Sequence, residues 1–192
     1  MKRILYRLAL IFAVVFMFLT AGVWAAEPVT VTVLDYFPGT GPAEAVGEGT
    51  GEGFTVNIPF TSGCGDSSFR MAMKEVVEPV VRQFNPEAIL VSLGTDAHYA
   101  DPLASLALSS VGYVELMEST IKLARETCDG RLAVALEGGY NPPALAEVLA
   151  ATEALFRGQS FKVTLTENRD QDCLGRQVVQ RVKEVQRRYW RL

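Results

Sequence analysis

The chain has 192 residues, 49% of them hydrophobic, with 22 acidic and 18 basic side chains. This length is enough for one domain with a modest core, and the net charge of −4 argues against general nucleic-acid binding. The three cysteines, Cys64, Cys128 and Cys173, are far apart and form no CxxC pair. They favour neither a disulfide framework nor a structural zinc site.

Residues 1–25 are typical of a targeting segment, with a positive start at Lys2 and Arg3 and an almost wholly apolar run over 4–19. A signal peptide cleaved after Ala25 is the favoured interpretation, and it would leave a body of net charge −7. An uncleaved membrane anchor stays open because the run approaches a bilayer-spanning length. A leader joined to an incomplete reading frame also stays open. A genuine leader predicts an exported or membrane-associated protein, with membrane contact only through this segment; otherwise the protein is expected in the cytoplasm.

Two short strands are predicted around a glycine-rich segment. Residues 29–34 alternate β-branched side chains, and residues 54–58 form a second strand that ends at Pro59. The segment between them, 38–53, is acidic, and no Gly-Lys-Ser/Thr follows it. The sequence therefore predicts a long surface loop rather than a phosphate-binding loop.

The central part of the chain alternates helix and strand. Helices are predicted where a capping residue precedes apolar residues at helical spacing, and strands where short apolar runs stop at glycine or polar residues. The expected caps of the three helices in this part are Asp66 or Ser67, Ser109 or Ser110, and Asn141. The predicted elements are a helix over 66–84, a strand over 88–93, a helix over 110–127, a strand over 132–136 and a helix over 142–157. This order predicts an α/β fold with a partial open parallel sheet, flanking helices and right-handed crossovers.

Residues 159–174 are polar and irregular, and residues 177–190 are predicted to form an amphipathic helix with a basic face. A helix packed on the domain, with its basic face in solvent, is favoured over a partner-binding arm. The organisation expected is thus an α/β domain over 26–158, with a polar linker and a C-terminal helix of the same domain over 159–192.

Two of the predicted strands stop abruptly in polar and glycine residues. One is followed by Asp96 and the other by Gly138, Gly139 and Tyr140. Ligands of parallel α/β proteins gather at the carboxyl ends of strands, so a carboxylate and a phenol there are candidate functional groups. On the residues alone, Asp96 as a turn former and Tyr140 as a half-buried aromatic side chain stay open.

Several segments together resemble the histone deacetylase superfamily, in particular its bacterial and archaeal acetoin-utilisation or acetylpolyamine amidohydrolase members. They are PGTG with VGEGTGEGFTVNIP, FNPEAILVSLGTDAHYADPLASL, GRLAVALEGGYN and VQRVKEVQRRYW. The resemblance runs from about Phe37 to the C-terminus. It implies the C-terminal part of the deacetylase/arginase-like fold and zinc-dependent hydrolysis of N-acetyl amides on lysine or polyamines.

The resemblance also implies roles for particular residues. Asp96 matches a zinc ligand, and Tyr140 matches the catalytic tyrosine that hydrogen-bonds the oxyanion. The positions that match pocket-shaping residues include His98, Asp101, Gly138 and Gly139. A ligand role for His98 stays open beside its favoured role at the pocket rim or in the structure.

The family's adjacent histidine pair and its Asp-x-His segment, which supplies two further zinc ligands, have no match in this sequence, which contains a single histidine. We therefore expect the C-terminal part of a deacetylase that is inactive alone. One alternative is a split deacetylase whose second chain supplies the missing N-terminal half. Another is an exported or membrane-tethered, non-catalytic interaction module. An active form would act on an acetylated small molecule or lysine.

Overall fold

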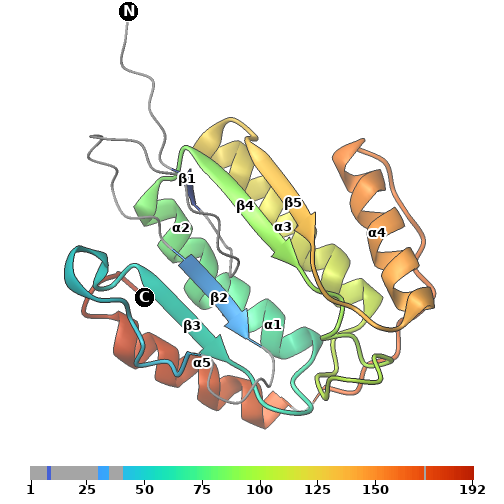
Figure 1. Cartoon of the computed structure of the whole chain (residues 1–192), viewed down its shortest axis with the longest axis horizontal. Coiled ribbons are helices and arrows are strands. Elements are labelled where there is room, and N and C mark those ends of the chain that lie inside the picture. The colour runs from blue at the N-terminus through green and yellow to red at the C-terminus, as the bar shows by residue number, and fades with distance from the viewer. Residues whose placement is uncertain (1–7, 10–29, 35–40, 171) are drawn as a thin grey trace, which may run out of the picture.

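The computed structural model describes residues 8–9, 30–34, 41–170 and 172–192. Its strands form two parallel sheets, one in the order β1-β4-β5 and one that pairs β2 with β3. The strands are β1 (Leu8–Ala9), β2 (Thr30–Leu34), β3 (Thr55–Pro59), β4 (Ala88–Leu93) and β5 (Leu132–Leu136). The predicted α/β class with parallel strands is confirmed. The arrows of β2 to β5 point to the same side of the molecule (Figure 1).

The pairing of β4 with β5 decides where the candidate residues lie. Both strands are short apolar runs, and their register pairs Ile89 with Leu132 and Leu93 with Leu136. The two strands therefore end side by side. The loops that follow them start from the same edge of the sheet, which is the arrangement expected from the sequence.

The helical segment predicted over 66–84 consists of three parts: α1 (Asp66–Ala72), the π-helical turn η2 (Met73–Val77) and α2 (Glu78–Phe84). Pro79 lies in the first turn of α2, directly after η2. Proline lacks the N–H of a regular helix interior, so a wider turn is tolerated there. The expectation that Asp66 or Ser67 caps this helix is wrong. The N-cap residue is Gly65, and the first turn has no capping hydrogen bond from a side chain of the N-cap residue.

The next two helices have the predicted capping residues. In α3 (Ser110–Cys128) the side chain of Ser109 accepts a hydrogen bond from the N–H of Gly112. In α4 (Pro142–Phe156) the side chain of Asn141 caps the first turn. Figure 1 shows α3 behind β4 and β5, and α4 beside β5. The other short helix is η1 (Gly49–Gly51).

The last helix, α5 (Asp172–Gln186), starts and ends earlier than the predicted range 177–190. It packs on β3, below it in Figure 1. The Nε2 of Gln186 donates to the carbonyl of Thr55 at 3.0 Å, and the indole N–H of Trp190 donates to the carbonyl of Gly53 at 2.9 Å. These two hydrogen bonds therefore join the C-terminal segment to β3 and to the loop before it, which lie more than 130 residues earlier in the sequence.

The core lies between the sheets and helices α1 to α5. Its fully buried members include Val56, Ile58, Val76, Val80, Leu108 and Val182. Cys64 and Cys128 are buried free thiols. Within the described ranges, no helix has the length and apolar character needed to span a bilayer. Of the predicted leader, only β1 is described, so the signal peptide or anchor stays a prediction.

Candidate functional site

The site is built from two loops that follow β4 and β5, and the backbone joins them directly. The N–H of Thr95 donates to the carbonyl of Gly138 at 2.9 Å, and the N–H of Glu137 donates to the carbonyl of Leu93 at 3.0 Å. These hydrogen bonds continue the contact of the two strands beyond the end of the sheet. The loops therefore form one wall at the carboxyl ends of the strands.

The carboxylate of Asp96 lies between two glycines of this wall. A Cβ added at Gly94 would lie 2.5 Å from its Oδ1, and a Cβ added at Gly138 would lie 2.7 Å from its Oδ2. Any larger residue at either position would displace the carboxylate. Asp96 is half-buried, and its side chain makes no hydrogen bond to a residue that the structure describes.

Gly139 has a backbone conformation that only glycine adopts readily, with φ of +129°. A Cβ at this position would overlap the hydroxyl of Thr95. That hydroxyl is itself buried, and it has no hydrogen-bond partner among the described residues. The two glycines predicted to shape the pocket thus allow the loop after β5 to approach Thr95 and Asp96 closely.

Tyr140 follows these glycines, and its side chain is 57% exposed. Its backbone N–H donates to Oδ2 of Asp101 at 2.6 Å. The other oxygen of Asp101 accepts the N–H of Leu103 at 2.9 Å. The amide of Asn141 donates to the carbonyl of Ala100 at 2.9 Å, so a second contact joins the two loops.

His98 is fully buried, away from solvent. Its Nδ1 accepts the N–H of Ala100 at 3.1 Å, which places the proton of the neutral ring on Nε2, 3.3 Å from the hydroxyl of Ser110. Burial lowers the pKa of His98, although the negative charges of Glu147, Asp66 and Asp101 act in the opposite direction. Both ring nitrogens are occupied, so this arrangement supports a structural role.

Three other acidic residues, which no motif of the sequence marks as functional, act as hydrogen-bond acceptors elsewhere. Asp66 accepts the N–H and the hydroxyl of Ser109, at 2.7 and 2.6 Å. Asp170 accepts the N–H of Gly65 at 2.7 Å and of Ser67 at 2.6 Å, at the start of α1. Glu147 accepts the N–H of Leu165 at 3.2 Å. Asp170 and Glu147 thereby hold the irregular segment before α5 against the body.

Hydrogen bonding also shifts the pKa of Asp170. Burial is the largest single influence on this carboxyl and raises its pKa, but hydrogen bonds from Ser67, Gly65 and Ser68 together outweigh it. The net pKa of Asp170 lies below the ordinary value of 3.8. The charged form is therefore favoured in the folded protein.

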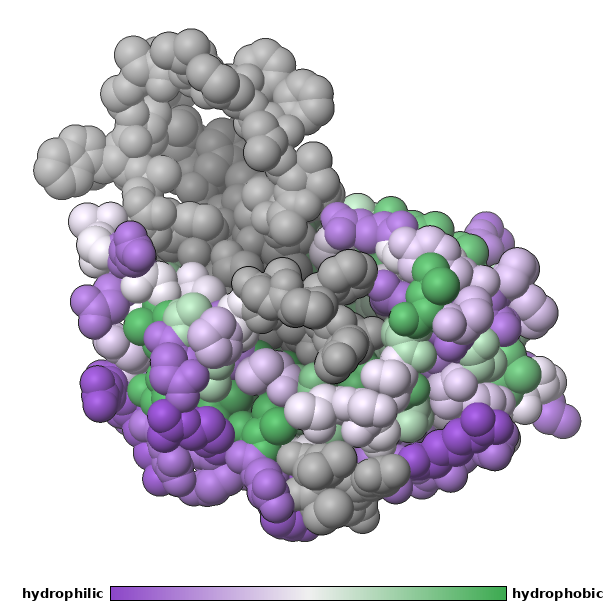
Figure 2. Space-filling model, turned by 60° about the horizontal axis from the view of Figure 1, so that its bottom comes forward, coloured by the Kyte–Doolittle hydropathy of each residue, from purple (hydrophilic) through white to green (hydrophobic). Residues whose placement is uncertain are grey.

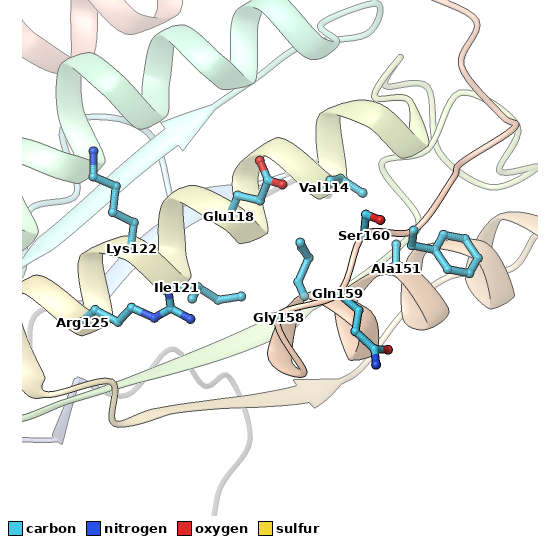
Figure 3. A pocket seen from close by; sticks show the side chains of 11 residues that line it. Val114, Glu118, Ile121, Lys122, Arg125, Ala151, Gly158, Gln159 and Ser160 are labelled. Carbon is cyan, nitrogen blue, oxygen red and sulfur yellow. The ribbon is translucent and has the colours of Figure 1, made fainter.

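A surface groove lies away from these loops. It has a volume of about 450 Å³ and is formed by α3, α4 and the turn after α4, with Ile121 and Leu155 among its apolar residues and Arg125 at one side (Figure 3). None of its lining residues comes from the loops after β4 and β5. Apolar and hydrophilic residues are interspersed on the face shown in Figure 2.

The described residues contain no group of three or more His, Cys, Asp or Glu side chains that could together hold a metal ion. The observations at the strand ends fit a single ligand instead. Asp96 is half-buried and has no hydrogen-bond donor among the residues that the structure describes, whereas buried carboxylates usually have such donors or a cation. The structure brings Asp96 beside Gly138 and joins Asp101 to Tyr140. It does not bring His98 to them as a ligand.

Comparison with known proteins adds a family match. The profile described as "Histone deacetylase domain" matches residues 31–155. A "Probable deacetylase" of Archaeoglobus fulgidus is 50% identical over 105 residues, which are 55% of this chain and 29% of that protein. "Histone deacetylase 14, chloroplastic" of Arabidopsis thaliana is 43% identical over 114 residues, 59% of this chain and 27% of that protein. The chain thus spans less than a third of these relatives.

Solved structures show the same likeness. The crystal structure of the HDA15 HD domain superposes with a TM-score of 0.73 at 29% identity, covering 85% of this chain and 44% of that one. The structure of the histone deacetylase Clr3 gives 0.76 at 30% identity, covering 86% of this chain and 28% of that one. The fold described above is therefore similar to a part of these domains.

Proposed function

The chain belongs to the histone deacetylase family, and on that premise we propose that it takes part in zinc-dependent hydrolysis of N-acetyl amides. The substrate class is an acetylated lysine or an acetylated small molecule such as a polyamine. One observation supports this most strongly. The carboxylate of Asp96 is held between Gly94 and Gly138 with no hydrogen-bond donor among the described residues.

Asp96 would be one ligand of the zinc ion, and Tyr140 would be the catalytic hydrogen-bond donor. Zinc, when bound, supplies a Lewis acid for the amide carbonyl. The exposed phenol of Tyr140 donates a hydrogen bond to the carbonyl oxygen as negative charge develops on it. Gly138 and Gly139 allow the loop that carries this phenol to lie against the loop of Asp96.

The remaining zinc ligands would come from outside the described residues. A catalytic zinc ion usually has three protein ligands and one open position. The single histidine of the sequence, His98, is buried with both ring nitrogens in hydrogen bonds. We therefore propose that this chain alone does not hydrolyse the amide, and that another segment or a second chain completes the site.

The outer edge of β5 is where such a polypeptide would pair. In the described sheets β5 is an edge strand, and Leu136 at its end is 48% exposed. An unpaired apolar edge favours addition of a strand. A strand added in parallel would end beside Gly138, which is in contact with Asp96. Its last residues would then lie close to Asp96.

A chimera tests the proposed function. Residues 31–155, which the family profile matches, would replace the corresponding residues of the Archaeoglobus fulgidus relative, whose other residues remain. We expect chelator-sensitive release of acetate from an acetyl-lysine peptide and from an acetylpolyamine. Asp96→Asn should abolish it, and Tyr140→Phe should lower kcat by about 10²- to 10³-fold, the usual effect of losing one oxyanion donor.

The matched control is Asp129→Asn, which changes an exposed carboxylate at the end of α3. It should leave acetate release unchanged. If Asp96→Asn and Tyr140→Phe are as active as this control in a folded chimera, the roles proposed for the two residues are wrong. Activity of the 192-residue chain alone would contradict the need for further ligands.

A further inference from the structure

The backbone just before Tyr140 restrains the position of this residue only weakly. The two residues before it are glycines, and Gly139 has a φ of +129°. Glycine is conformationally the most permissive residue, so its neighbours gain freedom. The side chain of Tyr140 is 57% exposed, so packing supplies limited restraint. Something else must hold its backbone if the phenol is to keep one position.

Asp101 supplies such a restraint from the neighbouring loop. Its side chain is buried, at 7% exposure, and Oδ2 accepts the N–H of Tyr140 at 2.6 Å. Oδ1 accepts the N–H of Leu103 at 2.9 Å, and the N–H of Asp101 itself donates to the carbonyl of His98 at 2.8 Å. Hydrogen bonds to a charged acceptor are stronger than those between neutral groups.

We propose that Asp101 is a positioning residue for Tyr140. Its carboxylate fixes the backbone N–H of Tyr140 relative to the loop after β4, and so fixes the point from which the phenol extends. The loop after β4 also carries Asp96, so this hydrogen bond fixes the backbone of Tyr140 relative to Asp96, in addition to the backbone hydrogen bonds and the Asn141 contact that join the two loops. The catalytic consequence rests on the proposed function, but the positioning itself does not.

Asp66 offers a matched control, because it has the same chemistry at another place. It is also buried, at 8% exposure, and it accepts a backbone N–H from a different element, that of Ser109. A general loss of stability should follow from replacing either aspartate. Only the loss of Asp101 should change the surroundings of Tyr140.

The experiment uses the full chain with 3-fluorotyrosine placed at position 140. We expect Asp101→Asn to shift or broaden the ¹⁹F resonance and to raise the exchange rate of the Tyr140 amide by at least about tenfold, as for a local opening. Asp66→Asn should leave both unchanged. An unchanged resonance and exchange rate in Asp101→Asn, or an equal change in Asp66→Asn, would overturn the proposal.

A measurement on the unsubstituted chain keeps the test valid if Asp101→Asn fails to fold. The amide of Tyr140 should exchange at least about tenfold more slowly than that of Gly139, whose N–H donates to no described residue. Equal exchange rates would contradict the proposal. None of these measurements needs metal, substrate or turnover, so their failure is distinct from failure of the proposed hydrolysis.

Discussion

The two carboxylates that contact the starts of α1 and α3 differ from the carboxylate that follows β4. Asp66 and Asp170 each accept hydrogen bonds on both oxygens from backbone N–H and hydroxyl groups. Asp96 accepts none from the described residues, although it is half-buried and enclosed by Gly94 and Gly138. Asp66 and Asp170 hold segments of the chain together, whereas Asp96 has no such partner among the described residues.

This difference separates stability from function in physical terms. A buried carboxylate with donors stabilises the fold, and one without them costs free energy that the rest of the structure must offset. Carboxylates without hydrogen-bond donors are typical of ligand-binding regions. The comparison therefore predicts that substitutions at Asp66 and Asp170 lower mainly the stability, and that substitutions at Asp96 lower mainly the activity.

The largest effect on stability is expected at Asp66. Asp66→Ala leaves the buried N–H and hydroxyl of Ser109 without their acceptor, which should lower the free energy of unfolding by about 3 kcal/mol. Urea denaturation measures it. A loss below about 1 kcal/mol would mean that this carboxylate does not hold the start of α3 as the comparison requires.

A smaller loss is expected at Asp170. Asp170→Ala removes the acceptor for backbone N–H groups at the start of α1 and should cost about 1–2 kcal/mol, as for loss of a helix cap. Because the pKa of Asp170 is lowered in the folded protein, its contribution should be complete above 3.8 and lost as the pH falls below that value. Hydrogen exchange should rise selectively in residues 164–170. Unchanged hydrogen exchange in these residues would contradict the proposal that Asp170 holds this segment against the domain.

His98 should make stability depend on pH over a different range. Burial lowers its pKa below the ordinary 6.5, so below pH 6.5 the unfolded chain takes up a proton that the folded chain does not. The free energy of unfolding should then fall as the pH drops from 6.5, by at most about 1.4 kcal/mol per pH unit. His98→Asn should remove this part of the pH dependence. If the free energy of unfolding of His98→Asn depends on pH as in the unsubstituted protein, this pH dependence comes from other groups.

The smallest effect on stability is expected at Asp96 itself. Asp96→Asn removes a charge that no described residue satisfies, so the free energy of unfolding should change by less than about 0.5 kcal/mol. Asp129→Asn, at an exposed turn, is the control for a carboxylate outside the site. A loss at Asp96 comparable with that at Asp66 would abolish the distinction between the two regions.

The sequence predicts the elements around the site because local signals coincide there. Asn141 before Pro142, and Ser109 before α3, are strong helix starts, and both caps are observed. The apolar runs of β4 and β5 end abruptly in polar and glycine residues, so the amino-acid pattern alone places Asp96 and Tyr140 just beyond the ends of strands.

Contacts between distant segments leave no such local signal. The sequence predicts that Asp66 or Ser67 caps its own helix. Instead, Asp170, about 100 residues later, accepts the N–H groups at the start of α1, and Asp66 accepts hydrogen bonds from Ser109. The link from Asp101 to Tyr140 likewise joins two loops 39 residues apart. No periodicity or short motif encodes such pairs, because they depend on how the strands and helices pack.

The zinc content of the chimera tests the central claim most directly, because that claim assigns Asp96 to a metal site. Zinc per protein would be measured after dialysis against a weak chelator. We expect one zinc ion in the unsubstituted chimera and in Tyr140→Phe, and loss of most of it in Asp96→Asn. An Asp96→Asn chimera that is folded and keeps its zinc with unchanged affinity would contradict the account.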